Sequence, residues 1–119
     1  MVSNILLVGL GGAGGSILRF LLQRSMNLSF PYGTLIANLV GCLLIGIFLS
    51  FSTKQVLNES YRLLLMTGFC GGFTTFSAFT QEGLQMLMQN RFTTFLLYLS
   101  ISVIGGFILT WIGYKLFNP

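Results

Sequence analysis

Four long apolar segments, separated by short polar stretches, make up most of this chain of 119 residues. The segments cover residues 5–22, 33–51, 63–88 and 92–117. A helix needs about 20 apolar residues to cross the hydrocarbon core of a bilayer, and each segment approaches or exceeds that length. The sequence therefore predicts an all-α membrane protein with one domain over residues 1–119. Its four transmembrane helices are expected at about residues 5–24, 33–52, 61–88 and 92–117.

Composition excludes several other classes of protein. Only 7% of the residues are charged, whereas soluble domains contain about a quarter. Histidine is absent, and Cys42 and Cys70 lie within apolar runs, which argues against metal clusters, histidine-based catalysis and a disulfide framework. The six basic residues are scattered singly, so we interpret them as interfacial anchors of helices and expect no nucleic-acid binding.

The distribution of lysine and arginine bears on how the chain inserts. The first segment has no basic residue before it and carries its glycines in the middle, so we interpret it as a retained helix and not as a signal peptide. Four crossings then place both termini on one side. The basic residues are divided almost evenly, with Lys54, Arg62 and Lys115 on one side and Arg24, Arg91 and the deeper Arg19 on the other. This balance favours insertion in both orientations and an antiparallel homodimer. Alternatively, so few charges fix one orientation too weakly for a count to reveal it.

The apolar segments are rich in glycine. Small residues let helices approach closely in lipid, either within one subunit or between subunits. We expect most of these glycines to pack within the subunit, and some of them between subunits. They are Gly11, Gly12, Gly14, Gly15, Gly41, Gly46, Gly105 and Gly106.

Polar side chains inside the predicted helices are functional candidates, because they are costly in a membrane. Arg19 either snorkels to the interface or attracts anions into a water-filled vestibule. Asn38 either joins helices or donates hydrogen bonds to an anion, and Thr34 shares its helix face. In the last helix, Tyr98 and Ser102 are four residues apart and begin a weak hydroxyl stripe.

Acidic residues distinguish two transport functions. A small proton-coupled exporter of cationic compounds needs a buried carboxylate for which proton and cation compete. Glu82, near the end of the third segment, is the only such candidate. The available chemistry is rich in donors and poor in acids, which favours an anion. The exporter remains the alternative, and a non-transporting assembly subunit is a third hypothesis.

The stretch GFCGGFTTFSAFTQEG, residues 68–83, predicts an interrupted third helix near Gly71–Thr75. An unbroken helix over residues 61–88 would be about 42 Å long, which exceeds a hydrocarbon core of about 30 Å. Gly71 and Gly72 add backbone freedom, and the following Phe-Thr-Thr lowers helix propensity. Carbonyls freed there would bind a cation, two from each chain of an antiparallel pair. The alternative is that the two glycines are only a notch for helix packing.

Two phenylalanines follow the expected interruption. Phe76 and Phe79 are three residues apart, with Ser77 and Thr80 interleaved. Phenylalanines at helical spacing usually face the core or lipid. The positive edge of an aromatic ring also attracts a small anion, to which neighbouring hydroxyls donate.

These residues together resemble the Fluc/CrcB fluoride channels. GFCGGFTTFSAFTQEG is similar to that family's third-helix signature, GGAGGSILRF to its first-helix motif and GTLIANLVG to its second-helix motif. YLSISVIGG fits the fourth helix less specifically. The resemblance covers essentially the whole chain.

The resemblance implies a dual-topology homodimer in the plasma membrane, with two antiparallel fluoride pathways and a central structural sodium ion. It assigns the sodium to the backbone carbonyls of Gly71 and Thr74. The implied pathway residues are Phe76, Phe79, Asn38, Arg19, Tyr98, Thr34, Ser77, Thr80, Ser102 and Glu82. Ala78 and Gly106 stand where some members have hydroxyls, so the polar track is expected to be thinner here. Some bacteria pair two paralogues instead, which is the alternative to a homodimer. The implied function is a passive fluoride channel that lowers intracellular fluoride without catalysing a reaction.

Overall fold

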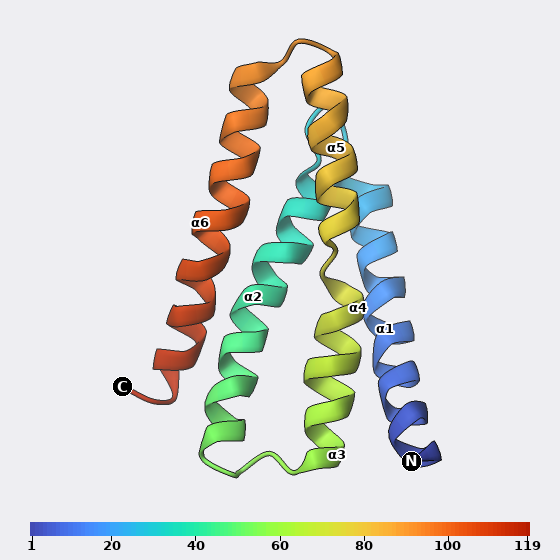
Figure 1. Cartoon of the computed structure of the whole chain (residues 1–119), viewed down its shortest axis with the longest axis vertical. Coiled ribbons are helices and arrows are strands. Elements are labelled where there is room, and N and C mark those ends of the chain that lie inside the picture. Colours follow the sequence, from blue (N-terminus) through green and yellow to red (C-terminus); the bar gives the residue numbers. More distant parts are fainter.

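The computed structural model describes all residues, 1–119, as a bundle of four membrane-length helical segments. Three crossings are single helices: α1 (Val2–Met26), α2 (Tyr32–Thr53) and α6 (Phe92–Leu116). The third crossing, Glu59–Met88, consists of α3 (Glu59–Arg62), the π-helical η1 (Leu63–Cys70), α4 (Gly71–Phe73) and α5 (Phe76–Met88). The prediction of four transmembrane helices is confirmed. Both termini lie at the same end of the bundle (Figure 1).

The bundle is a flat slab of 47 × 34 × 21 Å. α2 lies between α6 and the third crossing, and α1 packs against η1 and α4 on the far side (Figure 1). α5 and α6 form a hairpin whose turn contains Asn90 at a positive φ of 59°. This arrangement leaves one broad face of α2, α4 and α6 without a covering helix.

Glycines set the two closest helix contacts. A Cβ atom on Gly11 or Gly15 of α1 would meet backbone atoms of η1 and α4, so these backbones touch directly. Gly46 and Gly113 do the same between α2 and α6. Of the eight glycines expected to pack between helices, only Gly14 has nothing within 4 Å of its Cβ position. The other seven therefore pack within the chain, as expected for most of them.

In the third crossing, the residues with extended dihedral angles are two threonines and not the glycines. Gly71 and Gly72 lie inside helical α4, and Gly71 has ordinary helical angles of φ −62° and ψ −36°. Thr74 and Thr75 are extended, with ψ angles of 153° and 117°, and α5 begins at Phe76. The backbone freedom expected of the glycines is therefore not what separates α4 from α5. Gly72 serves close packing instead, because a side chain there would strike the backbone of Gly12.

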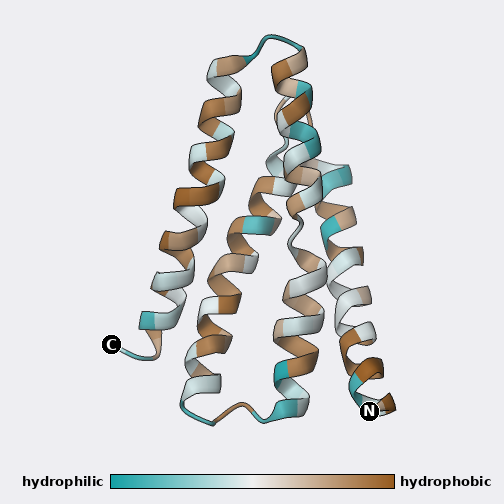
Figure 2. Ribbon diagram, in the orientation of Figure 1, coloured by the Kyte–Doolittle hydropathy of each residue, from teal (hydrophilic) through white to brown (hydrophobic).

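The surface of the bundle is largely apolar. Only 18 of the 119 residues are buried, and large apolar side chains are exposed along every crossing. Hydrophilic residues gather on α5 and on the C-terminal end of α1 (Figure 2). A surface of this kind is stable in lipid and not in water, so the chain is a multi-pass membrane protein.

Candidate functional site

The extended segment between α4 and α5 is held by the amide side chain of Asn38 on α2. The backbone N–H of Thr75 donates to Asn38 Oδ1 at 2.8 Å, and Asn38 Nδ2 donates to the Thr75 carbonyl at 3.2 Å. The Thr75 hydroxyl accepts from the N–H of Ala78 at 3.1 Å and so caps the start of α5. One side chain therefore pairs with both polar groups of Thr75, a residue predicted to lie at the interruption but not among the site residues.

The Gly72 carbonyl, at the end of α4, is bound by side chains of α1. In an unbroken helix it would accept from the N–H of Phe76. Here Arg19 Nε donates to it at 3.1 Å, and the Ser16 hydroxyl donates at a longer 3.4 Å. A cation near the C-terminal end of a helix is favourable, because the helix dipole is negative there. Arg19 thus has a structural contact beyond the two roles considered from the sequence.

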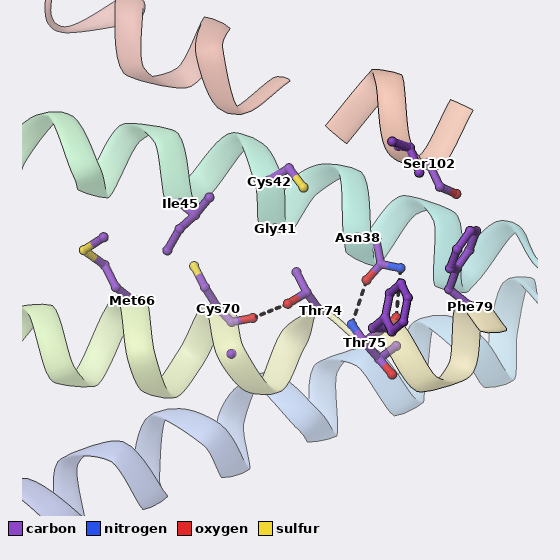
Figure 3. Close-up of a pocket in the computed structure, with 13 residues that line it drawn as sticks. Asn38, Gly41, Cys42, Ile45, Met66, Cys70, Thr74, Thr75, Phe79 and Ser102 are labelled. Carbon is purple, nitrogen blue, oxygen red and sulfur yellow. Dashed lines mark hydrogen bonds between the residues drawn. The ribbon is translucent and has the colours of Figure 1, made fainter. Parts of the chain in front are cut away.

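A pocket of about 410 Å³ lies beside this segment, between α2, η1, α4 and α6. Figure 3 shows Asn38 and Thr75 joined at one end of it, with Phe79 and Ser102 nearby. Six of the residues predicted from the sequence line this pocket. They are Asn38, Gly71, Thr74, Phe76, Phe79 and Ser102. The Ser102 hydroxyl oxygen is buried and has no hydrogen-bond partner within the chain.

Aromatic rings line one end of the pocket. The centroids of Phe76 and Phe79 are 5.9 Å apart, with the rings tilted by 43°. Phe79 also packs on Tyr98 at 5.1 Å. Phe76 is 77% exposed, although it lies in the middle of a crossing. The two rings thus have different surroundings, since Phe79 packs on the buried Tyr98 and Phe76 is largely exposed.

Glu82 is the centre of a hydrogen-bonded cluster, here called the Glu82 cluster, formed by Glu82, Thr34, Tyr98, Asn27 and Gln23. The Tyr98 hydroxyl donates to Glu82 Oε1 at 2.9 Å. Thr34 Oγ1 and Asn27 Nδ2 donate to Oε2 at 2.8 and 3.0 Å. Gln23 donates to the Thr34 hydroxyl at 3.0 Å. Thr34 and Tyr98 are fully buried, so the cluster satisfies polar groups that would otherwise be costly in this setting.

Replacing Glu82 with glutamine is expected to lower the free energy of unfolding by about 1–3 kcal/mol. The NH2 group of glutamine would take the place of one carboxylate oxygen, so a donor would face another donor. Thermal unfolding of the purified protein in detergent micelles measures the change. Glu59, the other of the two acidic residues, begins α3 and is exposed, so Glu59→Gln is the control and should have an effect within about 0.5 kcal/mol. Equal effects of the two substitutions would contradict a stabilising role for the cluster.

A second, polar pocket of about 440 Å³ lies between α1 and α5. Arg19, Ser77 and Glu82 line it, as predicted residues. The pocket is also lined by four residues that were not predicted from the sequence, Gln23, Asn27, Gln81 and Gln85. A signal for them existed, because residues 19, 23 and 27 and residues 77, 81 and 85 follow the four-residue spacing of one helix face.

The predicted site residues therefore fall into three groups and one outlier. One group lines the first pocket, another lines the polar pocket, and Thr34 and Tyr98 are buried in the Glu82 cluster. Thr80 stands apart, because it is exposed and its hydroxyl donates to the Ser77 carbonyl at 3.0 Å in its own helix.

Comparison with known proteins assigns the chain to a family. The family model described as "CrcB-like protein, Camphor Resistance (CrcB)" matches residues 6–114. The chain belongs to the CrcB family. Members of this family are ion channels and not enzymes.

The CrcB relatives match along nearly their whole length. A protein of Flavobacterium psychrophilum named "Fluoride-specific ion channel FluC" is 42% identical over 117 residues, which cover 94% of each chain. A protein of the same name from Escherichia coli K12 is 39% identical over 122 residues, covering 99% of this chain and 96% of the relative. One from Leptospira interrogans is 45% identical over 108 residues, covering 87% and 85%.

Proposed function

We propose that the chain forms a fluoride-selective passive ion channel that exports fluoride from the cytoplasm across the plasma membrane. The observation that carries this proposal is membership of the CrcB family, with relatives named as fluoride-specific channels at 39–45% identity. Hydrogen fluoride enters a cell as a neutral acid and ionises inside. Passive exit of the anion is therefore sufficient to lower intracellular fluoride.

The chemistry of the two pockets supports an anion. The polar pocket offers the Arg19 guanidinium and neutral amides, which attract an anion and donate to it. The Glu82 carboxylate in the same pocket already accepts hydrogen bonds from Tyr98, Thr34 and Asn27. The first pocket offers the rings of Phe76 and Phe79, the Asn38 amide and the unpartnered Ser102 hydroxyl. A path lined by ring edges and a few donors suits a small, poorly polarisable anion.

A proton-coupled cation exporter is a weaker candidate. Such a protein needs a carboxylate that a proton and a cation reach alternately. Both carboxylate oxygens of Glu82 already accept hydrogen bonds from Tyr98, Thr34 and Asn27. A cation would have to displace these donors first.

The functional unit in this proposal is an antiparallel homodimer with two pathways. One copy leaves Phe76 77% exposed and leaves the first pocket open at the uncovered face of the bundle. A second copy on this face would complete the lining. The balanced basic residues permit both orientations in the membrane. A paralogue is the alternative partner, and activity of the purified single chain would argue against it.

A structural sodium ion at the dimer interface fits the residues present. Sodium is held by oxygen ligands, and the Gly71 and Thr74 carbonyls belong to residues that line the first pocket. The N–H of Thr75, which would bond the Gly71 carbonyl in an unbroken helix, donates to Asn38 instead. Nothing lies within 4 Å of the Cβ position of Gly71, so a second chain can approach there. Four carbonyls, two from each copy, would hold the ion.

Fluoride efflux from liposomes that contain the purified protein tests the proposed function, with chloride efflux as the control. Fluoride is expected to leave at a rate far above that of protein-free liposomes, while chloride is retained. Absence of fluoride efflux, or equal passage of chloride, would contradict the proposal.

Labelling of a single cysteine tests dual topology. Cys42 and Cys70 are first replaced, and one cysteine is then placed at a terminus. An impermeant thiol reagent applied to intact cells should label about half of the protein, because the evenly divided basic residues give neither orientation an advantage. Labelling of all or none of it would exclude insertion in both orientations.

A further inference from the structure

One hydrogen bond affects both carbonyls of the proposed cation site, those of Gly71 and Thr74. It is the bond of 2.8 Å from the Thr75 N–H to Asn38 Oδ1. In helical geometry this N–H would donate to the carbonyl four residues earlier, that of Gly71. Asn38 therefore competes with Gly71 for one donor. While Asn38 accepts the hydrogen bond, the Gly71 carbonyl keeps its lone pairs for another ligand.

The same bond orients the Thr74 carbonyl. The Thr74 carbonyl and the Thr75 N–H belong to one planar peptide group, which is trans, since the chain has no cis peptide bond. In a trans peptide these two groups point in opposite directions. Because the N–H points to Asn38, the Thr74 carbonyl points away from Asn38 and α2. The second contact, from Asn38 Nδ2 to the Thr75 carbonyl at 3.2 Å, holds the side chain in this position.

Two other carbonyls near the end of α4, those of Cys70 and Gly72, have partners within the chain. The Cys70 carbonyl accepts from the N–H and the hydroxyl of Thr74, at 3.0 and 2.8 Å. The Gly72 carbonyl accepts from Arg19 at 3.1 Å. Those of Gly71 and Thr74 depend on Asn38 in the two ways described above.

We infer that Asn38 is a positioning residue for the cation site, acting through its side-chain oxygen. This inference rests on the proposed sodium site and adds a second role to a residue predicted to donate to the anion. The two roles use different atoms, since Oδ1 accepts from Thr75 while Nδ2 carries the donors. One amide thus links the anion pathway to the cation site.

The test is a sodium titration of thermal stability in detergent, at constant ionic strength with N-methylglucamine as the replacement cation. The melting temperature without sodium measures the stability of the fold. The sodium concentration at which half of the rise in melting temperature is reached, here called the sodium midpoint, measures the affinity of the cation site. Asn38→Leu keeps the number and branching of the side-chain heavy atoms, with bulkier methyl ends, but has no acceptor. The Thr75 N–H should therefore return to the Gly71 carbonyl. We expect the sodium midpoint to rise about fivefold, the effect of losing one hydrogen bond of typical strength.

Two further variants make the result specific. Asn38→Asp keeps the accepting oxygen and should restore the midpoint to within about threefold of wild type, or below it, because its charge attracts the cation. Asn58→Leu is the matched control, because Asn58 Oδ1 also accepts a backbone N–H, that of Tyr61 at 2.9 Å, in the exposed loop before α3. It should leave the midpoint unchanged. If Asn38→Leu does not assemble, Asn38→Ala removes the same acceptor with less bulk.

The outcomes separate this inference from the proposal on which it rests. A wild-type melting temperature that does not respond to sodium would overturn the cation site and this inference with it. A sodium-responsive wild type with an unchanged midpoint in Asn38→Leu would overturn only the role of Asn38. The role of Asn38 would also be overturned if Asn38→Asp had as high a sodium midpoint as Asn38→Leu. It would likewise be overturned if Asn58→Leu raised the midpoint as much as Asn38→Leu does.

Discussion

Replacing Phe76 with isoleucine is expected to reduce fluoride efflux to the level of protein-free liposomes while the protein still folds and assembles. Isoleucine keeps an apolar side chain but lacks the positive ring edge that would face the anion. Phe76 is 77% exposed in the single chain, so the substitution removes little packing within it. Fluoride efflux, measured together with the elution volume on size exclusion, tests both parts of the expectation.

Phe107 offers a matched control for this experiment. It lies on α6, is also 77% exposed and lines neither pocket. Phe107→Ile should leave efflux near the wild-type rate. Phe79→Ile should also abolish efflux, but it removes a ring that packs on Tyr98 and is expected to cost stability as well. Unaltered efflux in Phe76→Ile would remove this ring from the pathway.

Gly15→Ala is expected to lower the free energy of unfolding by at least about 3 kcal/mol, the upper end of the usual cost of overpacking. A Cβ atom at this position would lie 2.7 Å from the backbone nitrogen of Phe73 and would also strike the carbonyl oxygen of Phe69. Backbone atoms cannot move aside as a flexible side chain does. α1 would therefore have to separate from η1 and α4, and Arg19 would be drawn away from Gly72. Thermal unfolding in detergent and the yield of monodisperse protein measure the loss.

Gly9 provides the comparison within the same helix. No atom lies within 4 Å of its Cβ position, so an alanine there meets open space. Gly9→Ala should be neutral or should stabilise the protein by up to about 1 kcal/mol, because alanine favours the helix. If Gly15→Ala proves as mild as Gly9→Ala, the direct contact of α1 with the third crossing is not what holds the bundle together.

Several features of the site were accessible from the residues alone. Apolar length places the four crossings, because a bilayer requires about 20 apolar residues per helix whatever the fold. The ends of the helices differ from those predicted by at most three residues. Phe76, Phe79, Asn38 and Arg19 stand out because aromatic pairs and polar groups in apolar segments are unusual. The spacing that marks Gln23, Asn27, Gln81 and Gln85 was equally present in the sequence and was overlooked.

Other features depend on which helices meet. Periodicity along one helix does not reveal that Asn38 faces Thr75, since the two residues are 37 positions apart and lie on different crossings. It does not reveal that Arg19 reaches the Gly72 carbonyl across the contact between α1 and α4. The sequence left two roles open for Gly72, backbone freedom and close packing, for the same reason. Its backbone freedom is a local property, whereas its contact with Gly12 is a property of the packed bundle.

The sequence by itself determined that this chain resides in a membrane, how often it crosses, and which few residues bring polar chemistry into the crossings. These are properties of local composition, and the bilayer acts on each segment separately. The tertiary structure decided the partner of each polar group. It directs the Thr75 N–H to Asn38 and surrounds Glu82 with Thr34, Tyr98 and Asn27. A polar group buried in an apolar bundle must find a partner, and only the packing of the helices determines which partner lies within hydrogen-bond distance.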